Sequence, residues 1–367
     1  MSLRKKIAVS LVLSAVLLAA VVYLVGARET AAAAWQAGLP AFFTVGAFML
    51  AVMACQAFAW AALERKTGGV PKRDKSRLGA PHRVGYLTLL EATIVAMAGN
   101  ILTPMAHVGG EPGKVIYAGR KTGVSYTELA GTVLLCKYLE AMSFVLFLGF
   151  GTVIALVGFR HVLFGPAHLA EGVTIIVLAC AAALAAGAIW VGLVRRWTPL
   201  TGLVGLLARL RIRRAFFNRL HGRAMRMELL ASRLFRDEGG AVVPAFIFYL
   251  MSHVAMFIRP FVFFMLGWRL RLDMADLGLI FLVSQALLAV QLMPSGAGTL
   301  DLGLLGIIHI AGMRITDPQC ATFLLCVRFW DAAVVATGAL LAARAGVGLF
   351  RNGKQTSAEA AENAERK

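Results

Sequence analysis

The sequence predicts an all-α polytopic membrane protein, and two observations support this fold class. First, 59% of the 367 residues are hydrophobic and only 15% are charged, which is more apolar surface than a water-soluble domain can bury. Second, several apolar runs reach the roughly 20 residues that an α-helix needs to cross a bilayer, and they do not alternate as the strands of a membrane β-barrel would. About eight helical segments are expected, near residues 7–26, 39–63, 84–102, 127–157, 170–193, 241–268, 274–293 and 317–345.

The net charge of +18 is concentrated in two stretches of the chain. Residues 65–83 carry seven Lys and Arg, and residues 195–236 carry eleven Arg. Because basic loops of membrane proteins lie on the cytoplasmic side and face anionic lipid, both stretches are expected inside the cell, and nucleic acid is not an expected partner. In 195–236 the Arg residues mix with Leu, Phe and Met at helical spacing, which predicts amphipathic helices on the inner leaflet.

Counting membrane crossings from the basic N-terminus predicts two broken hairpins. For 195–236 to return inside, residues 84–120 must enter from the cytoplasm, break near Asn100–Pro104 and come back. The first half of this hairpin is only about 22 Å long, which is short of a full span. By the same count, residues 274–312 enter from the outside and break at 292–301. Each hairpin can be re-entrant or fully crossing, since both alternatives give the same orientation.

A single integral membrane domain is expected over residues 1–350, followed by a disordered cytoplasmic tail at 351–367. The counted crossings place both ends of the chain in the cytoplasm, in a multi-pass protein of the bacterial cytoplasmic (inner) membrane. Within the domain, residues 84–157 and 274–345 read as two copies of one repeat. Since the copies enter from opposite faces, they form an inverted-topology repeat, which is a recurrent plan among transporters.

The two copies share a break followed by a helix with a basic residue and, three positions later, an acid. A charged side chain at a helix centre costs roughly 2.5–3.5 kcal/mol on insertion scales, so these pairs should face the bundle interior. There they are either structural ion pairs or part of a polar cavity for a headgroup or a proton. Half-helix N-termini at the breaks also favour anions. The expected substrate-binding or translocation residues are Asn100, Pro104, Gly109, Gly110, Glu111, Lys137, Glu140, His253, Arg259, Pro294, Gly296, Gly298, Asp301, Arg328 and Asp331.

Two motifs give the chain a family resemblance over about residues 84–345. The first is GN-x3-P-x4-GGEP, and the second is P-x-G-x-G-x2-D, which carries Asp301 where a Glu is expected. In order and spacing they resemble the lysylphosphatidylglycerol synthase transmembrane, or flippase-like, family. The best-known members are fused to a soluble aminoacyl-transferase domain, which is not seen here. The resemblance therefore implies a membrane-only member that translocates lipid.

The expected function is a lipid flippase or transporter that moves an anionic or isoprenoid-phosphate lipid between leaflets through a polar midplane cavity. Two alternatives stay open. One is a non-catalytic partner of a lipid-modifying enzyme, and the other is an intramembrane lipid-processing enzyme with Ser295 as nucleophile and His309 as base. The chain is not expected to be an enzyme, because the catalytic signals are short matches. No metal or cofactor is expected. Expected partners are membrane lipids with an anionic headgroup, with a homo-oligomer or a lipid-synthesis enzyme as further candidates.

Overall fold

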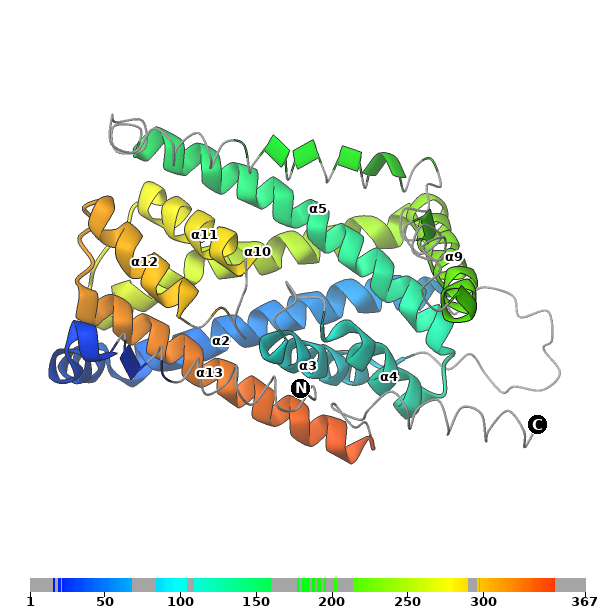
Figure 1. The fold of residues 1–367 in the computed structure, drawn as a ribbon, viewed down its shortest axis with the longest axis horizontal. Helices are drawn as coiled ribbons and strands as arrows, with labels where there is room; N and C mark the ends of the chain where they lie inside the picture. Colours follow the sequence, from blue (N-terminus) through cyan, green and yellow to red (C-terminus); the bar gives the residue numbers. More distant parts are fainter. Residues whose placement is uncertain are drawn as a thin grey trace.

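The computed structural model of the chain is a bundle of α-helices (Figure 1). It describes residues 22–67, 84–103, 109–159, 214–289 and 298–346, with isolated positions among 16–20 and 177–202 and at 296. The described residues are almost entirely helical and include no strand, so the predicted all-α membrane fold is confirmed. The described helices that are long and apolar enough to span a membrane are α2 (Ala27–Thr67), α5 (Tyr126–Gly158), α10 (Gly239–Trp268) and α13 (Asp317–Arg344).

Two pairs of shorter helices occupy opposite halves of the bundle (Figure 1). Helices α3 (Tyr86–Leu102) and α4 (Glu111–Thr122) lie in the right half of the view, and helices α11 (Met274–Ala289) and α12 (Thr299–Ile310) lie in the left half. Each helix is shorter than the roughly 20 residues that a full crossing requires. The chain therefore interrupts its helices where the sequence predicts the two breaks. How far each pair reaches into a bilayer remains a prediction.

The buried core changes character along the length of the bundle. One apolar cluster includes Trp60 and Tyr249, and a second cluster includes Phe257 and Phe323. Tyr249 and Phe257 are about two turns apart on α10, and the buried side chain of His253 lies between them on that helix. On α10, a buried polar side chain thus lies between the two apolar clusters.

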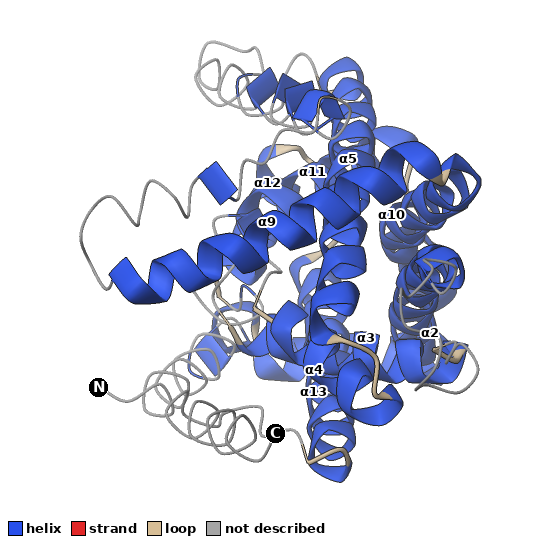
Figure 2. Cartoon of the chain, turned by 90° about the vertical axis from the view of Figure 1, so that its right-hand side faces the viewer, coloured by secondary structure: helices blue, strands red, loops and turns tan. Residues whose placement is uncertain are grey.

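Helix α9 (Arg214–Asp237) lies across one end of the bundle (Figure 2). It packs on α5, buries Leu234 and exposes Arg233. Its buried Glu228 accepts a hydrogen bond of 2.9 Å from the backbone N–H of Thr201. A helix with an apolar and a basic face across the bundle end has the geometry of an interfacial amphipathic helix. Most of the predicted segment before it, residues 195–213, lies outside the described residues.

Helix α2 consists of two helices joined at a kink. The backbone at Gly38 is not helical, with φ 71° and ψ 176°, and Pro40 follows. The sequence predicts the helix that starts after this kink, from residue 39, but not the shorter helix that precedes it from Ala27. Glycine tolerates this backbone conformation, and proline cannot donate a helical hydrogen bond, so the helix is interrupted here. The predicted segments 7–26 and 170–193, like the tail at 351–367, fall largely or wholly outside the described residues.

Candidate functional site

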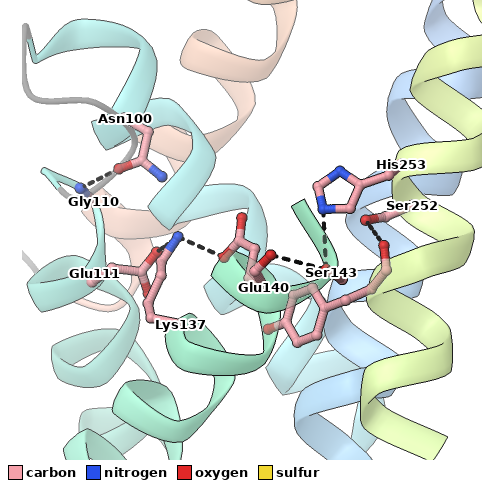
Figure 3. Close-up of polar contacts among 9 residues, drawn as sticks. Asn100, Gly110, Glu111, Lys137, Glu140, Ser143, Ser252 and His253 are labelled. Atoms are coloured by element: carbon pink, nitrogen blue, oxygen red, sulfur yellow. Dashed lines mark hydrogen bonds and ion pairs between the residues drawn. The ribbon is translucent and has the colours of Figure 1, made fainter. Parts of the chain in front are cut away.

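Lys137 of α5 lies between two carboxylates (Figure 3). Its Nζ is 2.9 Å from Oε1 of Glu111, the first residue of α4, and 2.8 Å from Oε2 of Glu140, one turn further along α5. None of the three side chains is more than 24% exposed. An ammonium group has three donors, so one lysine can hold both acids. We call Lys137, Glu111 and Glu140 the first triad.

The turn before Glu111 requires glycine. A Cβ on Gly110 would lie 1.8 Å from the carbonyl oxygen of Ala96 on α3, and a Cβ on Gly109 would collide with the side chain at the end of α3. The backbone N–H of Gly110 donates a hydrogen bond of 2.7 Å to Oδ1 of Asn100 (Figure 3), which satisfies a free N–H group at the start of α4. These predicted residues therefore position Glu111 against α5.

A small polar cavity borders the first triad. Its volume is about 20 Å³, and its lining includes Gln56, Asn100, Glu111, Lys114, Lys137 and Glu140. A cavity of this size holds about one water molecule, whereas a phosphate headgroup has several oxygens of that size. The first triad is closed to a headgroup in this conformation, and binding one there requires α3 and α4 to move relative to α5.

Lys114 is a residue of this cavity that sequence reasoning missed. It is 4% exposed, and its Nζ lies 4.6 Å from the ring centre of Trp60, a cation–π contact that offsets part of the lost hydration. The indole N–H of Trp60 donates to Thr132 at 3.0 Å and to Glu64 at 3.1 Å. A signal for Lys114 exists in the sequence, because it follows Glu111 by three positions on a helix and shares its face.

Arg328 of α13 also lies between two carboxylates. Its Nη2 is 2.8 Å from Oδ1 of Asp301, in the first turn of α12, and its Nη1 is 3.3 Å from Oδ2 of Asp331, one turn further along α13. Asp301 is fully buried, and its Oδ2 accepts a hydrogen bond of 2.9 Å from the backbone N–H of Gly298. Gly298 has a φ of 83°, a conformation that favours glycine. We call Arg328, Asp301 and Asp331 the second triad.

The two triads occupy equivalent positions in their helices. Lys137 is the twelfth residue of α5 and Arg328 is the twelfth residue of α13. Eleven helical steps rise about 17 Å, close to half the thickness of a bilayer's hydrocarbon core. Helices α5 and α13 run in opposite directions along the bundle (Figure 1). This arrangement agrees with an inverted repeat, which remains a prediction for the whole chain.

Helix α10 brings His253 next to the first triad. Its Nε2 is 3.1 Å from Oγ of Ser143, and that hydroxyl donates to the backbone carbonyl of Glu140 at 2.9 Å (Figure 3). Because the hydroxyl hydrogen is used in this bond, Nε2 of His253 is the donor to Ser143. The contact links α10 to α5 through the backbone at the triad.

Helix α10 also brings Arg259 next to the second triad. Arg259 lies six residues after His253, about 9 Å along the helix, and its guanidinium carbon is 5.6 Å from the ring centre of Phe323. The charges of Asp331 and Arg328 act on it. Its buried Nε has no hydrogen-bond partner among the described residues. Arg259 is therefore a guanidinium close to the second triad but not one of its hydrogen-bonded members.

Some of the remaining predicted residues fall outside the described part of the chain, and others are described but are not members of the two triads. Pro104, Pro294 and Ser295 lie outside the described residues, and Gly296 is described with a φ of 66°. His309 pairs with Asp317 instead of lining a buried site: its Nε2 is 2.8 Å from Oδ1 of Asp317, and its side chain is 67% exposed.

Comparison with known families settles the class of protein. The family model for the lysylphosphatidylglycerol synthase TM region matches residues 7–343. The chain belongs to this family. No curated protein and no solved structure matches it. As a lysylphosphatidylglycerol synthase TM region, the chain is a multi-pass membrane protein tied to lipid handling, and the resemblance carried by its two glycine-rich motifs is confirmed.

Proposed function

We propose that this protein is a lipid flippase or transporter that moves a lipid with an anionic phosphate headgroup between leaflets. One observation carries the proposal: two triads, each with one base held by two acids, have that base at the twelfth residue of helices that run in opposite directions. Family membership supports lipid handling and leaves the substrate to be determined.

In this mechanism the headgroup phosphate replaces one of the two carboxylates that bind the basic side chain of each triad. Lys137 offers an ammonium and Arg328 offers a planar fork of N–H donors, and both bind phosphate through charge-assisted hydrogen bonds. The displaced carboxylates can accept hydrogen bonds from hydroxyl or amine groups of the headgroup. The headgroup thus replaces its bound water with protein partners in steps, and it does not pass the two apolar clusters without a hydrogen-bonding partner.

Orientation follows from the basic stretches. We place the end of the bundle that bears α9 in the cytoplasm, because its exposed arginines suit an anionic inner leaflet. The α3–α4 pair then approaches the first triad from the inner side, and the α11–α12 pair approaches the second triad from the outer side. Both chain termini are cytoplasmic in this proposal, and the membrane is the bacterial cytoplasmic membrane.

The test is lipid transport by the purified protein in vesicles that contain fluorescent phosphatidylglycerol, with fluorescent phosphatidylcholine as the comparison lipid. Lys137→Met and Arg328→Met should each slow phosphatidylglycerol transport at least about tenfold, since losing one partner of a buried charge pair costs about 2–5 kcal/mol and each 1.4 kcal/mol is a factor of ten. Arg233→Met, on the exposed face of α9, is the matched control and should transport normally.

Full activity in folded Lys137→Met and Arg328→Met proteins would overturn the assignment of the triads. Absence of transport by the wild-type protein, together with co-purification of a lipid-modifying enzyme, would favour the alternative role as a non-catalytic partner.

A further inference from the structure

A groove opens beside the second triad. Its volume is about 470 Å³, and it is lined by Phe42 of α2 and by Leu325, Cys326, Arg328 and Phe329 of α13. This volume falls within the roughly 300–1,000 Å³ of sites that bind small molecules. The cavity at the first triad, at about 20 Å³, is far smaller. The two triads therefore differ in access: the first is closed and the second is open.

The groove faces the side of the bundle and not its ends. Phe329 follows Arg328, the twelfth residue of α13, and is 57% exposed. Its ring packs edge-on against Phe42 with centroids 5.0 Å apart. At this depth a spanning helix is surrounded by hydrocarbon chains. Apart from the guanidinium of Arg328, the side chains of the described residues that line the groove are apolar or weakly polar. Such a lining suits a hydrocarbon chain and not a hydrated solute.

The walls of the groove are fixed to each other. The indole N–H of Trp330 donates a hydrogen bond of 3.0 Å to the backbone carbonyl of Phe42. A Cβ on Gly46, one turn further along α2, would lie 2.4 Å from the Trp330 ring, so this glycine lets the indole approach the α2 backbone. The groove is thus a built feature of the α2–α13 contact.

Arg259 is a cation close to the second triad, and its buried Nε lacks a hydrogen-bond partner among the described residues. In the second triad, Asp301 and Asp331 both hydrogen-bond to Arg328. The charges of Arg328 and Asp331 act on Arg259, but its buried Nε has no partner among the described residues. A guanidinium binds phosphate through parallel N–H donors, so an incoming phosphate would provide the missing acceptor.

We propose that this groove binds the hydrocarbon chain of the transported lipid while its anionic phosphate headgroup contacts Arg259 and Arg328. The inference rests on the proposed function and makes it more specific. The occupant is one lipid: its hydrocarbon chain stays on the bilayer side of α2 and α13, and only its headgroup enters the bundle. Charge complementarity selects the headgroup, and the apolar lining accepts the chain. The structure is then the state that exchanges lipid at the second triad.

The test uses a photo-crosslinking amino acid in place of Phe329 in the full-length protein. The protein is placed in phosphatidylcholine vesicles with a minor fraction of phosphatidylglycerol, and the crosslinked lipids are identified by mass spectrometry. The matched position is Leu340, which lies about three turns further on the same face of α13 and is 65% exposed. A second arm replaces phosphatidylglycerol with a polyprenyl monophosphate, which separates the two sources of an anionic phosphate headgroup.

The expected result is that crosslinks at Phe329 are enriched several-fold in the anionic lipid over its fraction in the vesicle, and crosslinks at Leu340 are not. Arg259→Gln should remove the enrichment but leave crosslinking to bulk lipid, and Arg259→Lys should retain part of it. Equal lipid composition at both positions, or enrichment that survives Arg259→Gln, would overturn the proposal.

The crosslinking readout does not depend on transport. Enrichment at Phe329 in a protein that moves no lipid would overturn the proposed function and leave the groove as a lipid site. Transport without enrichment would overturn the groove and leave the function. If Arg259→Gln does not fold, the comparison of Phe329 with Leu340 in the otherwise unaltered protein decides the question.

Discussion

Replacing Gly110 with alanine tests how the α3–α4 pair is held together. The added Cβ would lie 1.8 Å from the carbonyl oxygen, 2.6 Å from the carbonyl carbon and 2.8 Å from the Cα of Ala96. All three are backbone atoms of α3, so no side-chain rotation can relieve the contact. Helix α4 would have to move away from α3, and Glu111, the residue after Gly110, would move with it.

The magnitude follows from two contributions. Overpacking of this kind costs about 1–3 kcal/mol. Moving Gly110 also lengthens its 2.7 Å hydrogen bond to Asn100, which adds about 0.5–1.5 kcal/mol. The total of about 1.5–4.5 kcal/mol corresponds to a fall in Tm of about 3–9 °C, at roughly 2 °C per kcal/mol for a chain of this size.

The assay is thermal unfolding of the purified protein in detergent, followed by tryptophan fluorescence, with Gly113→Ala as the matched control. Among the described residues, a Cβ on Gly113 would meet only Cγ1 of Val95 at 3.6 Å, an ordinary contact. Alanine is also a better helix former than glycine by up to about 1 kcal/mol. Gly113→Ala should therefore keep or raise the Tm. Equal Tm values for Gly110→Ala and Gly113→Ala would refute the close packing of the turn on α3.

Three further predictions concern other contacts. Asp301→Asn should destabilise the protein by about 3 kcal/mol or more, because it leaves the mostly buried Arg328 with one carboxylate; an unchanged denaturation midpoint would contradict the second triad as described. Gly46→Ala should lower the stability by about 1–3 kcal/mol, because its Cβ would lie within 2.4 Å of the Trp330 ring. Adding Trp330→Phe to this variant should recover part of the lost Tm. If the two substitutions lower the Tm additively, the result would argue against this contact. Lys114→Met keeps an aliphatic side chain and removes a buried charge, so lipid transport should fall while the Tm stays close to that of the unaltered protein. A loss of transport that comes with a clear fall in Tm would mean that this lysine is structural only.

Local patterns were enough to predict most helices and one of the two ion pairs in each triad. Hydropathy located α5, α10 and α13 within a few residues. The pairs Lys137 with Glu140 and Arg328 with Asp331 are three positions apart on one helix, so helical geometry alone brings them together. The glycine and proline residues at the two breaks were similarly visible, since they interrupt otherwise continuous apolar runs.

Contacts between distant segments could not be derived in this way. Glu111 and Asp301 were expected at the site, but their bonds to Lys137 and Arg328 span 26 and 27 positions and depend on how the short helices pack. Lys114 was missed because its burial is set by Trp60, on a different helix.

The helix that precedes the kink in α2 was missed for a different reason. The stretch before Gly38 is rich in alanine and includes charged residues, so its hydropathy is modest, whereas the glycine and proline at 38–40 mark the boundary that the structure has. Ala37 and Ala41 lie on either side of this kink, and both are buried in the apolar cluster with Phe257.

The charges around the two triads have a consequence for how the protein responds to voltage. Lys114 lies beside the first triad and Arg259 beside the second, so each group contains two bases and two acids. The first group is Lys114, Lys137, Glu111 and Glu140, and the second is Arg259, Arg328, Asp301 and Asp331. Moving one elementary charge across the membrane costs about 2.3 kcal/mol per 100 mV. Because the formal charges cancel within each group, a group that moves as one body carries no net gating charge. During such a movement the membrane potential would act on the charged headgroup of the bound lipid.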